Sequence, residues 1–136
     1  MKKMYFLTIS IILIITLCFL FGYYDENALN RRFLSRFGID VKEKPYLVED
    51  IEIPSEFDDF YNNYNVLQIE SGLDFSRYKG KKATRYTYEI VNFPHETESV
   101  VFANVITVKA KPVAGDINCP ALSGFVLPLS YFSSQK

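Results

Sequence analysis

Residues 55–90 have the sequence SEFDDFYNNYNVLQIESGLDFSRYKGKKATRYTYEI, in which the spacing of the apolar residues changes from that of a helix to that of a strand. In the first part, apolar residues recur three and four positions apart, as on a helix with one buried face. They are Phe57, Phe60, Tyr61, Tyr64 and Leu67. In the last part, Tyr86, Tyr88 and Ile90 alternate with polar residues, which predicts a half-buried strand. A helix followed by strands favours an α+β fold.

The helix in this region has signals at both ends. Ser55 is the expected N-cap with Asp58 three residues later, and Gly72 is the expected end. A shorter helix is expected earlier, over residues 25–38, because Leu29, Phe33 and Phe37 recur every four residues before Gly38. The chain therefore has two predicted helices before its main strands.

The remaining segments predict a small antiparallel sheet. Extended structure is expected at residues 39–41 and 46–53, further strands at 100–109 and 113–119 with a turn at Lys111-Pro112, and irregular structure or a short helical turn at 121–132. We therefore expect two helices packed on a three- to four-stranded antiparallel sheet, with residues 47–53 as the optional fourth strand. PepSY-like and cystatin-like domains offer an architectural analogy.

Residues 4–24 precede this domain and predict a transmembrane helix. They contain 17 hydrophobic residues, 12 of them Ile, Leu or Phe, and no charged residue. As a helix, 21 residues span roughly 31 Å, which matches the hydrocarbon thickness of a bilayer. Lys2 and Lys3 come before the segment, whereas Asp25 and Glu26 follow it. This asymmetry favours a single-pass protein of the cell membrane, with its N-terminus cytoplasmic and its C-terminal domain extracytoplasmic.

Two alternatives for this segment stay open. A cleaved secretory signal has a shorter apolar core and a small-x-small cleavage site, but only Gly22 is small near the exit. A lipoprotein would use Cys18, which here follows Leu17 rather than a small residue. Tyr23 and Tyr24 resemble the aromatic belt of a membrane interface. The favoured division is an uncleaved anchor at residues 1–24, an α+β domain at 25–132 and a polar tail at 133–136.

Charge and cysteine content exclude some functional classes. The net charge is −1, and without Lys2 and Lys3 the chain has 13 basic and 16 acidic residues. A dedicated nucleic-acid binder needs a basic excess, so no nucleic-acid partner is expected. Cys18 and Cys119 provide neither a disulfide framework nor a cysteine-rich metal site.

Several strings together resemble a known family. They are residues 53–68 (IPSEFDDFYNNYNVLQ), 78–80 (YKG), 85–94 (RYTYEIVNFP), 103–105 (ANV) and 115–117 (GDI). In this order they resemble the bacterial DUF4830 family over roughly residues 33–127. The resemblance implies a membrane-anchored or secreted bacterial protein without an established function. The family usually has Gly-Gly-Asp and Asp-Gly-Phe where this chain has Ala114-Gly115-Asp116 and Ser123-Gly124-Phe125.

The sequence contains little conventional catalytic chemistry. His95 is the single histidine, so Cys119 with His95 is the one thiol–imidazole pair available to a small thiol-dependent hydrolase. The simpler interpretation has His95 in a solvated loop and Cys119 as a small buried residue near a strand end. No metal-ligand cluster and no cofactor motif is visible, so no catalytic residue, metal or cofactor is predicted.

Binding is the favoured function. A basic cluster (Arg77, Lys79, Lys81, Lys82, Arg85) and an acidic cluster (Glu49, Asp50, Glu52, Glu56, Asp58, Asp59) could meet partners or pair with each other. If the family has a ligand site, we expect it at Arg85, Tyr86, Gly115 and Asp116. The leading hypothesis is a non-catalytic binding or interaction module of the bacterial envelope. Its expected partners are the lipid bilayer through residues 4–24 and an envelope protein or an anionic polymer.

Overall fold

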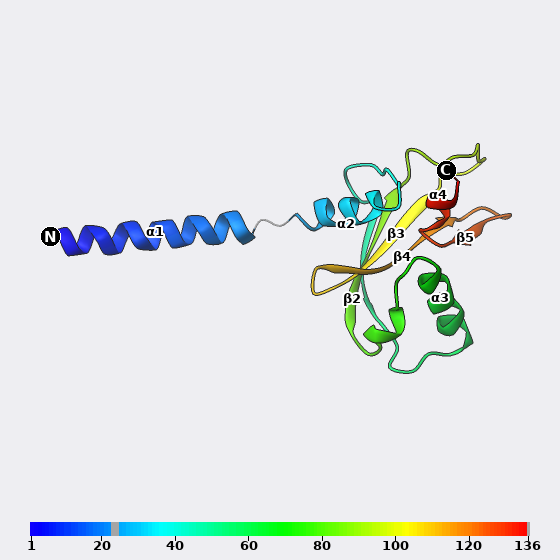
Figure 1. Ribbon diagram of the computed structural model, residues 1–136, viewed down its shortest axis with the longest axis horizontal. Helices are drawn as coiled ribbons and strands as arrows, with labels where there is room; N and C mark the ends of the chain where they lie inside the picture. Colours follow the sequence, from blue (N-terminus) through cyan, green and yellow to red (C-terminus); the bar gives the residue numbers. More distant parts are fainter. Residues whose placement is uncertain (23–24, 136) are drawn as a thin grey trace.

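The structure, a computed structural model, describes residues 1–22 and 25–135, without the side chains of residues 18–22 (Figure 1). The N-terminal helix α1 covers Lys2–Gly22. The elements that follow are α2 (Glu26–Ser35), β1 (Leu47–Glu52), α3 (Asp59–Glu70), the 3-10 helix η1 (Phe75–Tyr78), β2 (Lys82–Glu89), β3 (Phe102–Val108), β4 (Lys111–Cys119), β5 (Phe125–Leu127) and α4 (Tyr131–Ser134). The α+β class predicted from the sequence is confirmed.

The strands form one five-stranded antiparallel sheet in the order β1-β2-β3-β4-β5. The prediction of three to four strands is therefore wrong, because β5 has only three residues and is too short to show a strand period. The turn expected at Lys111-Pro112 is also displaced. Lys109 and Ala110 make it instead, with φ angles of 50° and 61°, and Pro112 belongs to β4 beside a register shift opposite Thr107.

Both faces of the sheet are covered, so the domain has two apolar clusters. On one face, α2 contributes Phe33 and Leu34 to a cluster with alternate residues of the strands, among them Tyr86, Tyr88, Ala103, Val105 and Ile117. On the other face, Tyr61 and Tyr64 of α3 pack with Phe75, Ile106 and Ala114. Since neighbouring residues of a strand point to opposite faces, the three central strands β2, β3 and β4 contribute to both clusters.

The helices begin at side-chain caps that are partly different from those predicted. Asp25 accepts a hydrogen bond from the Asn27 backbone N–H at 3.0 Å and caps α2. In α3 the cap is Asp58, whose carboxylate accepts from the Tyr61 N–H at 3.0 Å, and not the predicted Ser55. The apolar stripe is only partly buried, because Phe60 is 69% exposed. The residue of α3 that is fully buried is Gln68.

The N-terminal helix α1 lies apart from the sheet in Figure 1, and its large apolar side chains from Met4 to Leu17 are exposed. Among the described residues, no helix has both the length and the hydropathy needed to cross a membrane. The predicted interfacial residues Tyr23 and Tyr24 and the Cys18 side chain lie outside the described residues. At the other end, α4 continues to Ser134, into the predicted polar tail.

Candidate functional site

A row of polar side chains crosses the sheet on the face that carries α3. The strand register aligns Thr87 of β2, Asn104 of β3 and Asp116 of β4. The Thr87 hydroxyl donates to Asn104 Oδ1 at 2.7 Å, and Asn104 Nδ2 donates to Asp116 Oδ1 at 2.9 Å. From α3, the Tyr64 hydroxyl donates to Asp116 Oδ2 at 2.7 Å. Each carboxylate oxygen of Asp116 therefore accepts a hydrogen bond from a different element.

Asp116 is buried, with 6% of its surface exposed. Burial raises the pKa of its carboxyl, and the hydrogen bonds from Asn104 and Tyr64 act against that rise. The pKa of Tyr64 is raised well above its usual value, first by burial and then by the charge of Asp116. A buried acid with a shifted pKa beside a hollow is a common mark of a functional position.

Gly115 joins α3 to β4 through its backbone. Its N–H donates to Gln68 Oε1 and its carbonyl accepts from Gln68 Nε2, both at 2.9 Å. β5 pairs with β4 only from Ile117 to Cys119, so the Gln68 amide satisfies β4 backbone groups beyond the end of β5. A Cβ atom at position 115 would lie 2.6 Å from the Asn104 carbonyl oxygen and 2.9 Å from Leu129 Cδ1. The position therefore requires glycine for close packing.

Arg85 borders the same region from β2. Its side chain is 44% exposed and pairs with Glu49 of the edge strand β1, with Arg85 Nη2 2.6 Å from Glu49 Oε2. Burial raises the pKa of Asp116, and the positive charge of Arg85 acts against that rise. A groove of about 370 Å³ lies beside them. It is lined by Phe60, Asn63, Tyr64, Leu67, Arg85, Asn104, Asp116, Asn118 and Val126.

Of the four predicted site residues, Tyr86 lies on the opposite face of the sheet. There its hydroxyl donates to Glu26 in the first turn of α2, and burial raises its pKa. Tyr88, on the same face, donates to Asn27 at 2.8 Å and accepts from Asn30 at 3.1 Å. Tyr86 therefore helps to hold α2 on the sheet, while Arg85 and Asp116 line the groove beside α3 and Gly115 binds α3 through its backbone.

A comparison with family patterns matches residues 33–117 to Domain of unknown function (DUF4830). The match covers more than half of the chain. The chain belongs to the DUF4830 family. The DUF4830 match begins in α2 and ends in β4, so it includes Arg85, Gly115 and Asp116. No curated protein and no solved structure matched the chain.

The structure gives the thiol-enzyme hypothesis for this DUF4830 protein no geometric support. Cys119 is buried in the cluster beneath α2, whereas His95 is exposed in the loop between β2 and β3. His95 Nε2 lies 3.1 Å from the Tyr131 hydroxyl. The hydrogen bonds of the described residues include none between His95 and Cys119. Within the same residues, no group of three or more potential metal ligands was found.

The residues that hold Asp116 and Gly115 in this DUF4830 protein were not predicted as site residues: Tyr64 and Asn104 bind Asp116, and Gln68 binds Gly115. Tyr64 was assigned to the apolar stripe, and Gln68 lies four residues further along the same helix face. This spacing is a sequence signal that would have predicted both side chains to face the sheet. The role of Asn104 depends on the register between β3 and β4, which the sequence pattern does not fix.

Proposed function

We propose that this protein is a membrane-anchored binding module of the bacterial envelope whose groove takes a peptide segment of another envelope protein. The observation that supports this most is the position of Asp116 at the groove. Its carboxylate is buried but held by Tyr64 and Asn104, so it is an ordered acceptor for a ligand donor.

The groove has the mixed chemistry that suits a peptide. Asn63, Asn104 and Asn118 supply amide groups, which can both donate to and accept from a peptide backbone. Phe60 and Val126 are 69% and 50% exposed and offer apolar surface for side chains. The lining contains one cation and one carboxylate, Arg85 and Asp116. An anionic polymer would gain little from this balanced charge, so a peptide is the better ligand for this groove.

A displayed random-peptide library tests this proposal. Peptides selected on the full chain in detergent should bind at least tenfold more weakly to Phe60→Ala and to Asn104→Ala. Val66→Ala is the matched control, because Val66 is a similarly exposed apolar residue of α3 that does not line the groove. Peptides that bind all four proteins equally would contradict a site in the groove.

The anchoring part of the proposal rests on the sequence of residues 4–24, which has no charge over 21 residues. The side chains of residues 18–24 in that segment are not among those that the structure describes. In the proposed arrangement the N-terminus is cytoplasmic and residues 25–136 are outside the cell membrane. A protease added to intact cells should then remove a C-terminal tag and leave an N-terminal tag intact and membrane-bound. A C-terminal tag that is digested only after lysis would contradict this topology.

A further inference from the structure

A second hollow, separate from the groove, is strongly basic. It measures about 570 Å³ and lies between α2, the end of η1 with the residues that precede η1, and the start of β4. We call it the basic hollow. It is lined by Leu29, Arg32, Phe33, Arg36, Gly72, Leu73, Asp74, Arg77, Tyr78, Lys111, Pro112 and Val113. Four of these side chains are cationic and one is anionic.

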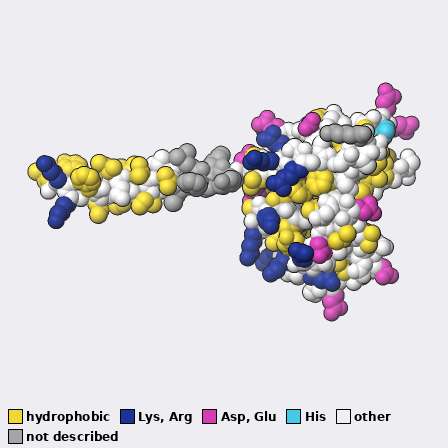
Figure 2. Space-filling view, in the orientation of Figure 1, with side chains coloured by type: hydrophobic (Ala, Val, Ile, Leu, Met, Phe, Trp, Pro, Cys, Tyr) yellow, Lys and Arg dark blue, Asp and Glu magenta, His cyan; other side chains and the backbone are white. Residues whose placement is uncertain are grey.

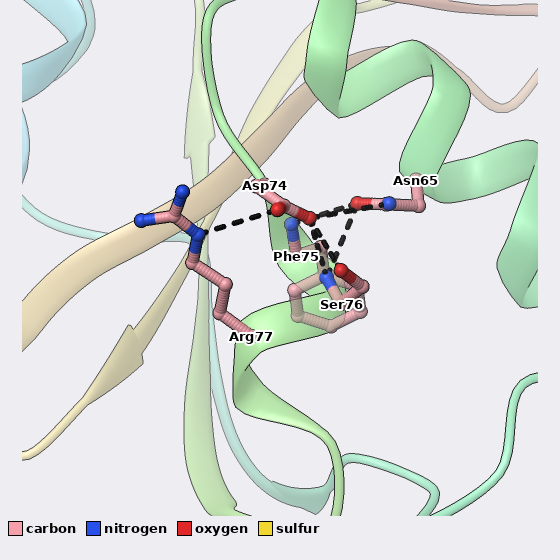
Figure 3. Close-up of polar contacts among 5 residues, drawn as sticks. All are labelled: Asn65, Asp74, Phe75, Ser76 and Arg77. Atoms are coloured by element: carbon pink, nitrogen blue, oxygen red, sulfur yellow. Dashed lines mark hydrogen bonds and ion pairs between the residues drawn. The ribbon is translucent and has the colours of Figure 1, made fainter.

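The single carboxylate of the basic hollow is already engaged. Asp74 accepts hydrogen bonds from the Ser76 hydroxyl at 2.5 Å, from the Ser76 N–H at 3.2 Å and from Asn65 at 3.4 Å (Figure 3). These bonds, the Ser76 hydroxyl first, lower the pKa of Asp74. Arg77 Nε is 3.3 Å from the second carboxylate oxygen, while its two terminal nitrogens point away from Asp74 (Figure 3). The Arg77 side chain is 77% exposed and still offers donors to a ligand.

The other three cations are exposed and have no acidic partner within the described residues. Arg32 and Arg36 are four positions apart and therefore lie on one side of α2 and its C-cap. Lys111 begins β4 opposite them. The salt bridges of the described part of the chain involve Lys42, Arg77 and Arg85. Figure 2 shows Lys and Arg side chains gathered on the side of the domain where α2 lies.

We propose that the basic hollow binds phosphate groups of anionic lipids at the surface of the bilayer that holds the anchor. Guanidinium groups hold phosphate oxygens through paired hydrogen bonds, and a cluster of them is selective for an anion. The inference rests on the proposed anchoring for the source of the phosphate. One residue, Asp25, separates the end of the proposed anchor at 24 from the start of α2 at Glu26, a chain length of at most about 7 Å. Arg32 follows the start of α2 by six residues, about 9 Å along the helix, so this short connection keeps the basic hollow close to the headgroup layer.

The acidic residues at the start of α2 make their contacts outside the basic hollow. Asp25 is used as the N-cap of the helix, and Glu26 accepts a hydrogen bond from Tyr86. Neither Asp25 nor Glu26 lines the basic hollow. Basic groups this close to an anionic surface each add to membrane attraction, and that attraction weakens with salt.

Hydrogen–deuterium exchange of the full chain in lipid nanodiscs tests the proposal. One set of discs contains phosphatidylcholine alone and the other contains 30% phosphatidylglycerol as well. We expect the anionic discs to slow exchange severalfold in residues 29–36, 72–78 and 111–113, because a ligand that binds the folded form suppresses local opening. Exchange in β3 should be the same in both discs and reports that the domain is folded.

Two triple variants distinguish binding in the basic hollow from a general attraction between the cations of the domain and anionic lipid. Arg32→Gln/Arg36→Gln/Lys111→Gln should lose the slower exchange, while Lys44→Gln/Lys81→Gln/Lys82→Gln should retain it. The second variant removes the same charge from exposed positions outside the basic hollow. No effect of phosphatidylglycerol, or an equal loss in both variants, would overturn the proposal.

Two further arms distinguish the source of the phosphate and the anchoring. Inorganic phosphate added to phosphatidylcholine discs should not reproduce the slower exchange; if it does, the lipid source is wrong. If the chain does not enter nanodiscs, the proposed anchoring fails. Short-chain phosphatidylglycerol added to the chain in neutral detergent then tests the basic hollow separately, and no slowing there would overturn it too.

Discussion

Asp116 is a buried carboxyl group, and a carboxyl group in the interior of a protein needs hydrogen-bond partners. Both of its oxygens accept hydrogen bonds, from Asn104 and Tyr64, but the environment still raises its pKa because burial outweighs these bonds. The charge of Arg85 acts in the opposite direction. The protonation state of Asp116 is therefore coupled to the stability of the domain.

This coupling predicts a pH dependence that Asp116→Asn removes. The folded protein holds the Asp116 proton to higher pH than the unfolded chain, in which an Asp has a pKa of about 3.9. The contribution of Asp116 to the free energy of unfolding therefore falls as pH rises from about 4 through the raised pKa. Urea unfolding at pH steps from 4 to 7 should show the difference, wild type minus Asp116→Asn, decreasing over this window.

Glu43→Gln provides the control for the loss of one carboxylate, since Glu43 is exposed in the loop before β1. The difference between wild type and this variant should stay flat over the same pH steps. A wild-type-minus-Asp116→Asn difference that rises with pH would show that the folded state stabilises the ionised carboxylate. That result would contradict the role assigned to burial.

At the scale of elements, one amide of α3 binds the backbone of β4. Gln68 satisfies both the N–H and the C=O of Gly115 where β5 no longer pairs with β4. Gln68→Ala leaves two buried backbone groups without partners, each costing about 1–3 kcal/mol. We expect chemical denaturation to show a loss of about 2–4 kcal/mol in the free energy of unfolding.

Two companion variants show whether the hydrogen bonds are responsible. Gln68→Met retains most of the side-chain volume, so it should lose a similar amount of stability if the amide matters more than packing. Glu70→Ala changes an exposed residue of the same helix and should alter stability by less than about 0.5 kcal/mol. A Gln68→Met protein as stable as the wild type would contradict the prediction.

The elements also show what sequence patterns can and cannot predict. The spacing of the apolar residues predicted α3 and β2. The alternation in β2 already implied that Arg85 and Tyr86 point to opposite faces of the sheet. The start of α3 was predicted three residues early, because Ser55 and Asp58 are both good caps. Phe57, just before the cap, stacks on Tyr61 in the first turn of α3, with ring centroids 5.4 Å apart, and this local contact accompanies the later start.

Gln68 shows why the sequence could not predict the candidate site in full. A glutamine in a helix is normally expected at the surface, and the sequence does not show that a strand next to it lacks backbone partners. The register of β3 and β4 decides that Asn104 meets Asp116, and a register is a long-range property. Residues 115 and 116 were nevertheless expected in the site, and the structure places Asp116 in the groove with Arg85, while Gly115 contacts α3 through Gln68.

At the scale of the whole molecule, the two proposed binding surfaces differ in charge. The groove contains one charge of each sign, whereas the basic hollow contains four cations and one carboxylate. α2 lines the basic hollow and α3 lines the groove, and both helices pack on β4. A module held to a bilayer by one surface would thus keep the other available for a protein partner.

The last prediction concerns the independence of the domain from α1. Both apolar clusters begin at Phe33 or later, and the apolar side chains of α1 up to Leu17 are exposed. Residues 25–136 expressed alone should therefore unfold cooperatively by circular dichroism, at a temperature within about 5 °C of the full chain in detergent. Residues 37–136 should not fold cooperatively, because the shorter chain lacks the buried Phe33 and Leu34, each worth about 2–5 kcal/mol. If residues 25–136 also failed to fold, α1 would have to contribute to the stability of the sheet, and its role could not be anchoring alone.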